Sequence, residues 1–193
     1  MALAGFLFAE PLVNKPLIVL IGAPGSGKTV QAEAISKTHG IPVLSAEQMI
    51  REHKELLEAS RNPKISGMEP RSDPALNRIL GVYLTQGGYG KGLLLDGYPA
   101  TKDHCDYLLN LVKNGTVPPP VVFQLDVDDA TVRKRMAAEA GASLEQRIKD
   151  YHREMDMVQL YFPAADIVKI DAAKKPSAVT KEIEKVLKVR LGN

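Results

Sequence analysis

The sequence predicts an α/β fold in which helices cover both faces of a mostly parallel sheet. Two observations lead to this prediction. Short runs of leucine and β-branched residues recur along the 193 residues, and segments with helical spacing of apolar residues separate these runs. Strands buried on both faces have such continuous apolar runs, and strands that alternate with helices pair in parallel. The length fits one domain, so we expect a single unit over residues 1–193.

Five apolar runs are the expected strands. The first run is followed by glycine, and the third and fifth are followed by Asp96 and Asp171, which are the residue types expected where a strand gives way to a loop. In chain order the runs are Leu17–Ile21, Ile41–Leu44, Leu93–Leu95, Val121–Val127 and Ile167–Ile170.

Capping patterns mark the ends of several helices. Ser45–Gln48 and Ser143–Gln146 each place a glutamine three residues after a serine, so we expect the serine to cap a backbone N–H and the glutamine to reach back. The pair Asp73-Pro74 predicts the start of a further helix. Gly40 and Gly115 are expected to end helices in the left-handed conformation. The helix after Asp73 is expected to bury one face, which carries Leu76, Ile79, Leu80, Tyr83 and Leu84.

The composition excludes several classes of protein. Lysine and arginine number 25 against 23 acidic residues, without the concentrated basic stripe that nucleic-acid binding requires. Cys105 is the only cysteine, which rules out an internal disulfide, and the four histidines lack the spacing of a zinc site. The apolar stretch Ala2–Ala9 is too short to span a bilayer, and we interpret residues 1–15 as an N-terminal arm. We therefore expect a cytoplasmic monomer that binds small molecules, and neither nucleic acid nor a membrane.

The segment Gly22–Thr29 reads Gly-Ala-Pro-Gly-Ser-Gly-Lys-Thr and lies between an expected strand and an expected helix. Its glycines allow successive backbone N–H groups to turn toward an anion. Lys28 supplies positive charge for the β- and γ-phosphates, and the Thr29 hydroxyl is a ligand for Mg²⁺. This P-loop predicts a site for ATP with Mg²⁺, formed by Gly22, Pro24, Gly25, Ser26, Gly27, Lys28, Thr29 and Val30. In the helix that follows, the side chains of Val30, Ala34 and Ile35 are expected to face the sheet.

An acidic residue is required beside the P-loop, because Mg²⁺ keeps several waters and a carboxylate must orient them. Asp96 directly follows the run Leu93–Leu95, so its side chain is expected at a strand end near the P-loop. The expected ligands of Mg²⁺ are therefore Thr29 and Asp96. The alternative for Asp96 is a cap of the turn that follows it.

These motifs resemble those of an adenylate kinase, or more broadly a nucleoside monophosphate kinase, of the short-lid type. The resemblance implies a P-loop kinase fold with a five-stranded parallel sheet, a flap at residues 45–88 that holds the acceptor, and a short lid at residues 133–147 that closes over ATP. The implied activity is reversible transfer of a γ-phosphoryl group between nucleotides. Six segments carry the resemblance in order: Gly22–Lys28, Leu44–Arg51, Gly92–Pro99, Val122–Val127, Arg147–His152 and Val168–Ala172.

The resemblance also implies roles for particular residues. The catalytic set that it implies is Lys28, Asp96, Arg135 and Arg147. Arg135, whose guanidinium is expected to stack on the adenine ring, and Ala173 are expected to contact ATP in addition to the P-loop. The acceptor is expected to contact Ser45, Arg51, Arg71, Gly97, His104 and Arg147.

Several positions depart from the family pattern. Ala100 stands where the family has an arginine that grips the acceptor phosphate, and His104 stands where it has a base-reading glutamine. The lid lacks the usual arginines near Ala138 and Ala140, and the usual Ser-Thr-Gly-Asp of the flap is Ser45–Gln48. A transition-state arginine contributes on the order of 10³ to 10⁵ in rate.

Three functions therefore remain open. The first is a phosphotransferase that moves the γ-phosphoryl group of ATP to a nucleoside monophosphate. The second is a nucleotide-binding pseudoenzyme with a regulatory or scaffold role. The third is a P-loop kinase for a non-nucleotide hydroxyl compound, for which Glu47 is the local carboxylate able to act as base.

Overall fold

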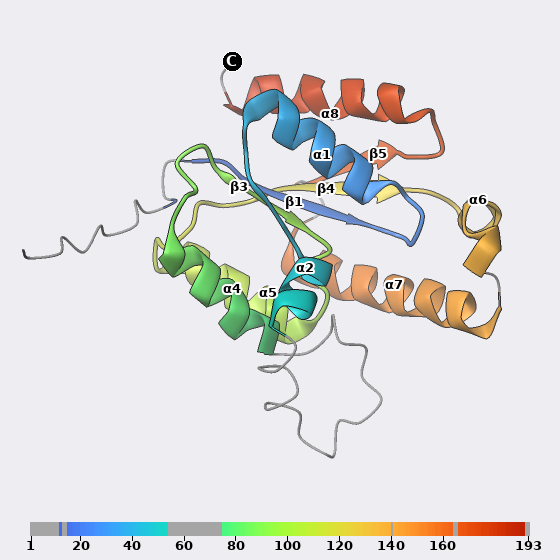
Figure 1. Ribbon diagram of the computed structural model, residues 1–193, viewed down its shortest axis with the longest axis horizontal. Helices are drawn as coiled ribbons and strands as arrows, with labels where there is room; N and C mark the ends of the chain where they lie inside the picture. Colours follow the sequence, from blue (N-terminus) through green and yellow to red (C-terminus); the bar gives the residue numbers. More distant parts are fainter. Residues whose placement is uncertain (1–11, 13–14, 54–74, 140, 164–165, 192–193) are drawn as a thin grey trace, which may run out of the picture.

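A five-stranded parallel sheet with the strand order β2-β3-β1-β4-β5 forms the centre of the protein (Figure 1). The computed structural model describes residues 12, 15–53, 75–139, 141–163 and 166–191. The strands are β1 (Leu17–Gly22), β2 (Val43–Ser45), β3 (Leu93–Asp96), β4 (Val121–Asp126) and β5 (Ile167–Asp171).

Helices cover both faces of this sheet. Helices α1 and α8 contact each other on one face, and α4, α5 and α7 lie on the other (Figure 1). A single turn of 3₁₀ helix, η4, links α6 to α7. The helices and this turn are α1 (Lys28–His39), α2 (Ala46–Glu52), α4 (Ala75–Gln86), α5 (Lys102–Lys113), α6 (Asp129–Arg135), η4 (Ala137–Glu139), α7 (Ala142–Tyr161) and α8 (Pro176–Leu191).

The middle strand β1 ends at the edge of the sheet where the candidate functional residues lie. It pairs with β3 on one side and β4 on the other, and residues 17–20 are at most 1% exposed. Because all strands run in parallel, their carboxyl ends meet at one edge: Ser45 lies opposite Asp96, and Asp126 lies opposite Asp171. Ligands of open α/β sheets bind at this edge, where the strand order reverses about β1.

The predicted strands and the buried face of α4 are confirmed. Four strands begin where the apolar runs begin, while β2 starts two residues after Ile41. Leu76, Ile79 and Leu80 of α4 are at most 1% exposed, and Tyr83 and Leu84 pack against the same core. Gly40 and Gly115 have φ values of 66° and 75°, as expected after helix ends.

Helix starts match the predictions only in part. Ser45 caps α2 by accepting the Gln48 N–H at 3.0 Å, but the Gln48 amide bonds to Glu52 at 3.1 Å instead of reaching back. The prediction that Ser143 caps α7 is wrong. That helix starts at Ala142 and its N-cap is Gly141, whose φ of 133° favours glycine, so Ser143 already lies inside the first turn. The expected start at Asp73-Pro74 falls outside the described residues.

The prediction for the buried face of α1 also needs correction. Val30 is 51% exposed, whereas Gln31, Ala32 and Ile35 are buried. The Gln31 amide donates to the Pro176 carbonyl at 3.1 Å, and its oxygen accepts from the Thr180 hydroxyl at 2.8 Å. Helix α8 thus satisfies a polar side chain that a hydrophobic pattern assigns to the surface.

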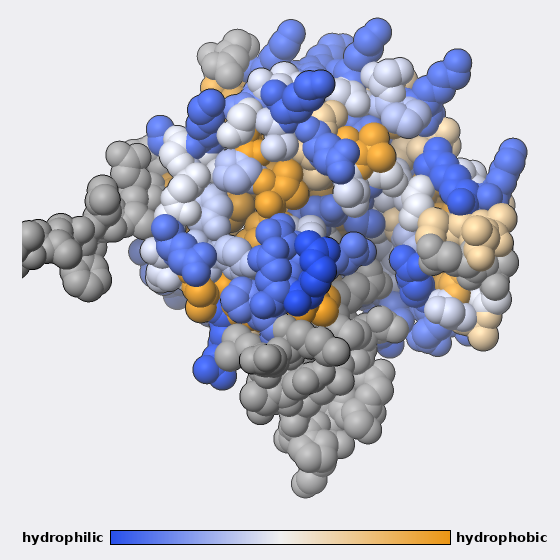
Figure 2. Space-filling model, viewed as in Figure 1, coloured by the Kyte–Doolittle hydropathy of each residue, from blue (hydrophilic) through white to orange (hydrophobic). Residues whose placement is uncertain are grey.

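Exposed apolar side chains are scattered over the surface of the described residues. Large exposed apolar side chains lie one each on α1, α4, α7 and α8, at Val30, Val82, Leu160 and Val189. Hydrophilic residues predominate on the face shown in Figure 2, with smaller apolar areas between them. Within the described ranges, every helix is too short or too polar to cross a bilayer.

Candidate functional site

The loop between β1 and α1 has the backbone that an anion requires. Gly25 and Gly27 have φ values of 67° and 91°, which a side chain would strain. A Cβ on Gly22 would lie 2.7 Å from the Ser26 hydroxyl oxygen and 2.8 Å from the Leu125 carbonyl oxygen. The loop therefore needs glycine at all three positions.

Several hydrogen-bond donors in this loop are left for a ligand. The N-cap of α1, Gly27, provides no side-chain bond, and the first turn carries no acidic residue. Its N–H groups and the positive end of the helix dipole are therefore available to an anion. The Ser26 hydroxyl is buried and has no hydrogen-bond partner among the described residues. Phosphate oxygens would supply the acceptors that these donors lack.

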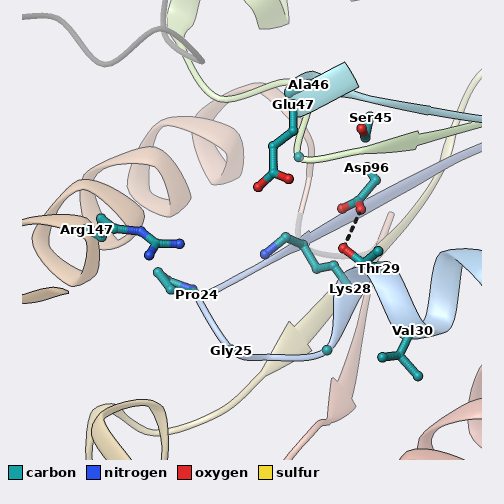
Figure 3. A pocket seen from close by; sticks show the side chains of 12 residues that line it. Pro24, Gly25, Lys28, Thr29, Val30, Ser45, Ala46, Glu47, Asp96 and Arg147 are labelled. Carbon is teal, nitrogen blue, oxygen red and sulfur yellow. Dashed lines mark hydrogen bonds between the residues drawn. The ribbon is translucent and has the colours of Figure 1, made fainter. Parts of the chain in front are cut away.

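Lys28 lies in the first turn of α1 with its ammonium folded back over the loop. The Nζ atom donates to the Gly22 carbonyl at 2.8 Å and to the Ala23 carbonyl at 3.1 Å. These bonds hold a positive charge at the edge of the cavity, where Figure 3 shows the side chain pointing inward.

Asp96 ends β3 beside the start of α1. The Thr29 hydroxyl donates to its carboxylate at 3.2 Å, so two predicted Mg²⁺ ligands from distant parts of the chain meet (Figure 3). Burial is the main influence on Asp96 and raises its pKa. The Lys28 charge and the Thr29 bond oppose that shift, and the charge of Glu47 adds to it.

This pair of residues fits Mg²⁺ chemically. A hydroxyl and a carboxylate are the oxygen donors that Mg²⁺ prefers, and the ion usually takes few protein ligands because it keeps waters and phosphate oxygens. In the part of the chain that the structure describes, no group of three or more His, Cys, Asp or Glu side chains forms a dedicated metal cage. Thr29 and Asp96 would hold the ion together with the phosphates.

A cavity of about 240 Å³ opens between the P-loop, the start of α2, the end of β3 and α7. The side chains of Lys28, Glu47 and Arg147 reach it from three different helices and point toward one common space (Figure 3). The cavity is lined by Pro24, Gly25, Gly27, Lys28, Thr29, Val30, Ser45, Ala46, Glu47, Asp96, Gly97 and Arg147. The structure thus brings together most of the predicted donor residues with three of the predicted acceptor residues.

Arg135, at the end of α6, lies on the outer side of the P-loop. Its guanidinium donates to the carbonyls of Ala172 at 2.8 Å, Ala173 at 3.2 Å and Gly25 at 3.2 Å. Next to it, Met136 packs so closely on Gly25 that a Cβ there would lie 2.9 Å from the Met136 Cγ. Arg135 therefore joins the P-loop to the loop after β5.

The other predicted acceptor residues are not gathered at the cavity. Arg51 is exposed on α2 and is not among the residues that line the cavity, and Arg71 falls outside the described residues. His104 is fully buried, stacks on Tyr98 with 4.8 Å between ring centroids, and accepts the Ala100 N–H at 3.4 Å. The prediction that His104 contacts the acceptor is therefore corrected, because its ring is buried against Tyr98 and does not line the cavity.

The sequence motifs do not indicate that Ala46 and Glu47 line the site. Ala46 was not predicted to line the site, and Glu47 was considered only as the base of a hydroxyl kinase. Their signal is the cap at Ser45, since a helix that starts beside Asp96 must direct its first residues at the P-loop edge.

Comparisons with known proteins agree with this geometry. The family model described as Adenylate kinase matches residues 20–167. The adenylate kinase of Mesorhizobium japonicum is 31% identical, over 88% of this chain and 96% of its own. The adenylate kinases of Brucella abortus and Brucella ovis are 26% and 25% identical, over 88% of this chain and 97% of theirs.

Proposed function

Because the chain belongs to the adenylate kinase family, we propose that it transfers the γ-phosphoryl group of ATP to a nucleoside monophosphate. The observation that carries this proposal is the P-loop, which has donors without a partner among the described residues and lines one cavity together with Asp96 and Arg147. A triphosphate seated on these donors would present its γ-phosphate to that cavity.

The donor side needs charge and hydrogen bonds at fixed positions. Lys28 and the start of α1 would bind the β- and γ-phosphates, and Ser26 would donate its hydroxyl to one of their oxygens. Thr29 and Asp96 would hold Mg²⁺, which supplies positive charge to the phosphate oxygens when bound. Arg135 would close over ATP from the outer side of the P-loop, next to Ala173.

The transfer needs no general base, because an acceptor phosphate is already an anion. One of its oxygens forms a bond to the γ-phosphorus while the bond from that phosphorus to the bridging oxygen breaks. The products are ADP and a nucleoside diphosphate. Arg147 reaches the cavity from the side opposite Lys28, so it would stabilise charge on the phosphoryl group in transit (Figure 3).

The acceptor would lie toward the start of α2 and the loop after β3. Ser45 and Gly97 line the cavity on that side. We assign Arg51 and Arg71 to the acceptor phosphate, the flap to residues 45–88 and the short lid to residues 133–147. Within that lid, the Arg133 guanidinium forms a bidentate ion pair with the Glu145 carboxylate, with hydrogen bonds of 2.7 and 2.9 Å that join α6 to α7.

A coupled assay with ATP·Mg²⁺ and each of AMP, GMP, CMP and UMP tests this function. At least one monophosphate should give diphosphate well above a Lys28→Ala control. If none does while calorimetry still detects ATP binding, phosphotransfer to nucleotides is disproved and nucleotide binding alone remains.

A second function, nucleotide binding without transfer, has one specific observation in its favour. Ala100, which replaces the family's acceptor arginine, is 5% exposed, and its N–H is engaged by His104. This position is therefore buried, and its side chain provides no positive charge for an acceptor phosphate. Regulation or scaffolding would then be the role of ATP binding, and the same assay separates the two functions.

A further inference from the structure

Glu47 holds a fixed place at the mouth of the cavity. It lies in the first turn of α2, two residues after Ser45, and the backbone of Ser45 is paired in register with Asp96. The Ser45 cap fixes where the helix begins, so the first turn cannot shift along the chain. Figure 3 shows the Glu47 side chain extending from α2 into the space between Lys28 and Arg147.

The Glu47 carboxylate is not engaged by other parts of the site. No hydrogen bond or ion pair within the described ranges involves it. It is near enough to Asp96 for its charge to contribute to the raised pKa of that buried carboxyl. Two carboxylates therefore face a cavity whose expected ligands are phosphates.

A glutamate at this position commonly serves to stabilise its helix, because a negative side chain in the first turn interacts favourably with the positive end of the helix dipole. That role does not require the side chain to line a cavity. Ser45 and Ala46 line the same wall without charge, so Glu47 is the negative side chain that α2 contributes to the cavity.

An acceptor phosphate must approach the γ-phosphate through the space that Glu47, Lys28 and Arg147 share. There it gains from the two cations and is repelled by the carboxylate. Opposite and like charges a few ångströms apart at a solvent-accessible site change affinity by about tenfold each, and salt reduces the effect.

We propose that Glu47 lowers the affinity of the acceptor site for any acceptor that brings a phosphate to the cavity. This inference rests on the proposed function, because it needs an acceptor site at this position. The repulsion concerns the phosphate and not the base, so it should act equally on the four common monophosphates and not on a nucleoside.

The test compares Glu47→Gln, which removes the charge and keeps the shape, with Glu33→Gln, which removes the same charge from an exposed position on α1 outside the cavity lining. Calorimetry measures binding of AMP, GMP, CMP and UMP, and of adenosine as the ligand without phosphate. Glu47→Gln should bind all four monophosphates about tenfold more tightly at low salt and adenosine as before. The gain should shrink at high salt, and Glu33→Gln should behave as the unmodified protein.

The opposite results overturn the inference in distinct ways. Unchanged monophosphate binding, or none to either protein, contradicts a repulsive role. A gain for adenosine as well would point to shape instead of charge. Weaker binding of ATP·Mg²⁺ to Glu47→Gln would make Glu47 a support of the metal, and loss of transfer to a hydroxyl compound would make it a base.

The same experiment keeps the inference separate from the proposed function. Tighter monophosphate binding without any diphosphate formation upholds the role of Glu47 and refutes phosphotransfer. Diphosphate formation with equal kcat/KM and equal monophosphate affinity in both proteins upholds phosphotransfer and refutes the role of Glu47.

Discussion

At the scale of single residues, the donor site depends on a lysine and an aspartate whose environments differ. The Lys28 ammonium lies on loop carbonyls at the cavity edge, where a phosphate can reach it. Asp96 is buried, and folding therefore places a carboxylate where water cannot solvate it well. The charged carboxylate of Asp96 that Mg²⁺ binding requires therefore lowers the stability of the fold.

Replacing Lys28 with alanine should weaken ATP binding about 100-fold, because a charge-assisted contact to a phosphate contributes about 1.5–3 kcal/mol. Titration calorimetry with ATP·Mg²⁺ measures the effect. The midpoint of thermal unfolding without ligand serves as the control for folding. An affinity within twofold of the unmodified protein would contradict the assignment of the β- and γ-phosphates to this lysine.

Asp96→Asn should stabilise the ligand-free protein at neutral pH while reducing the stabilisation given by ATP·Mg²⁺. Burial raises the pKa of Asp96 above its ordinary value of 3.8, so the folded state favours the protonated carboxyl. The stability cost of the charge is absent below 3.8 and appears as the pH rises through the folded-state pKa.

Thermal unfolding of both proteins, measured between pH 3 and 8 wherever both are folded, tests this sign. The unfolding midpoint of Asp96→Asn should exceed that of the unmodified protein by an amount that grows with pH. A difference that stays constant, or that reverses at high pH, would show that desolvation does not govern this carboxyl.

At the scale of elements, helix starts decide which side chains reach the site. Ser45 caps α2 beside β3, and Gly141 starts α7, which carries Arg147 less than two turns later. The backbone of Gly141 has φ 133° and ψ −167°, a conformation that is essentially restricted to glycine. This glycine therefore sets where α7 begins.

Gly141→Ala should destabilise the protein by about 1–3 kcal/mol through backbone strain alone, because none of the described residues offers an atom within 4 Å of an added Cβ. Gly90→Ala is the matched control, since a Cβ there is equally unobstructed and the backbone is not in the left-handed range. Urea unfolding measures both. Equal losses in the two variants would show that the Gly141 conformation imposes no special cost.

The same elements show what a single sequence can predict. Strands such as Leu17–Ile21 were predictable because buried parallel strands are apolar throughout. The start of α7 was not, since Ser143 has the right spacing for a cap and only the backbone angle of Gly141 decides against it. Val30 was assigned to the wrong face of α1, because Gln31 is buried next to it and its partner lies 145 positions away on α8.

At the scale of the whole molecule, the parallel sheet gathers residues that are far apart in the chain. Thr29 and Asp96 are 67 positions apart and share a hydrogen bond, and Arg135 reaches Gly25 across 110 positions. The P-loop and Asp96 were predictable because each lies at the carboxyl end of a strand, and these ends meet at the same edge of the sheet. The burial of His104 was not, because it depends on stacking against Tyr98 inside the tertiary core.

Direct transfer of the γ-phosphoryl group at this edge of the sheet can be followed with a radioactive label. Unmodified protein and Lys28→Ala are each mixed with γ-³²P-labelled ATP, Mg²⁺ and a nucleoside monophosphate, and the labelled products are separated by chromatography. The label should appear in the nucleoside diphosphate with the unmodified protein and remain in ATP with the variant. Label that stays in ATP, or that appears only as inorganic phosphate, with the unmodified protein and all four monophosphates would contradict direct transfer to a nucleotide.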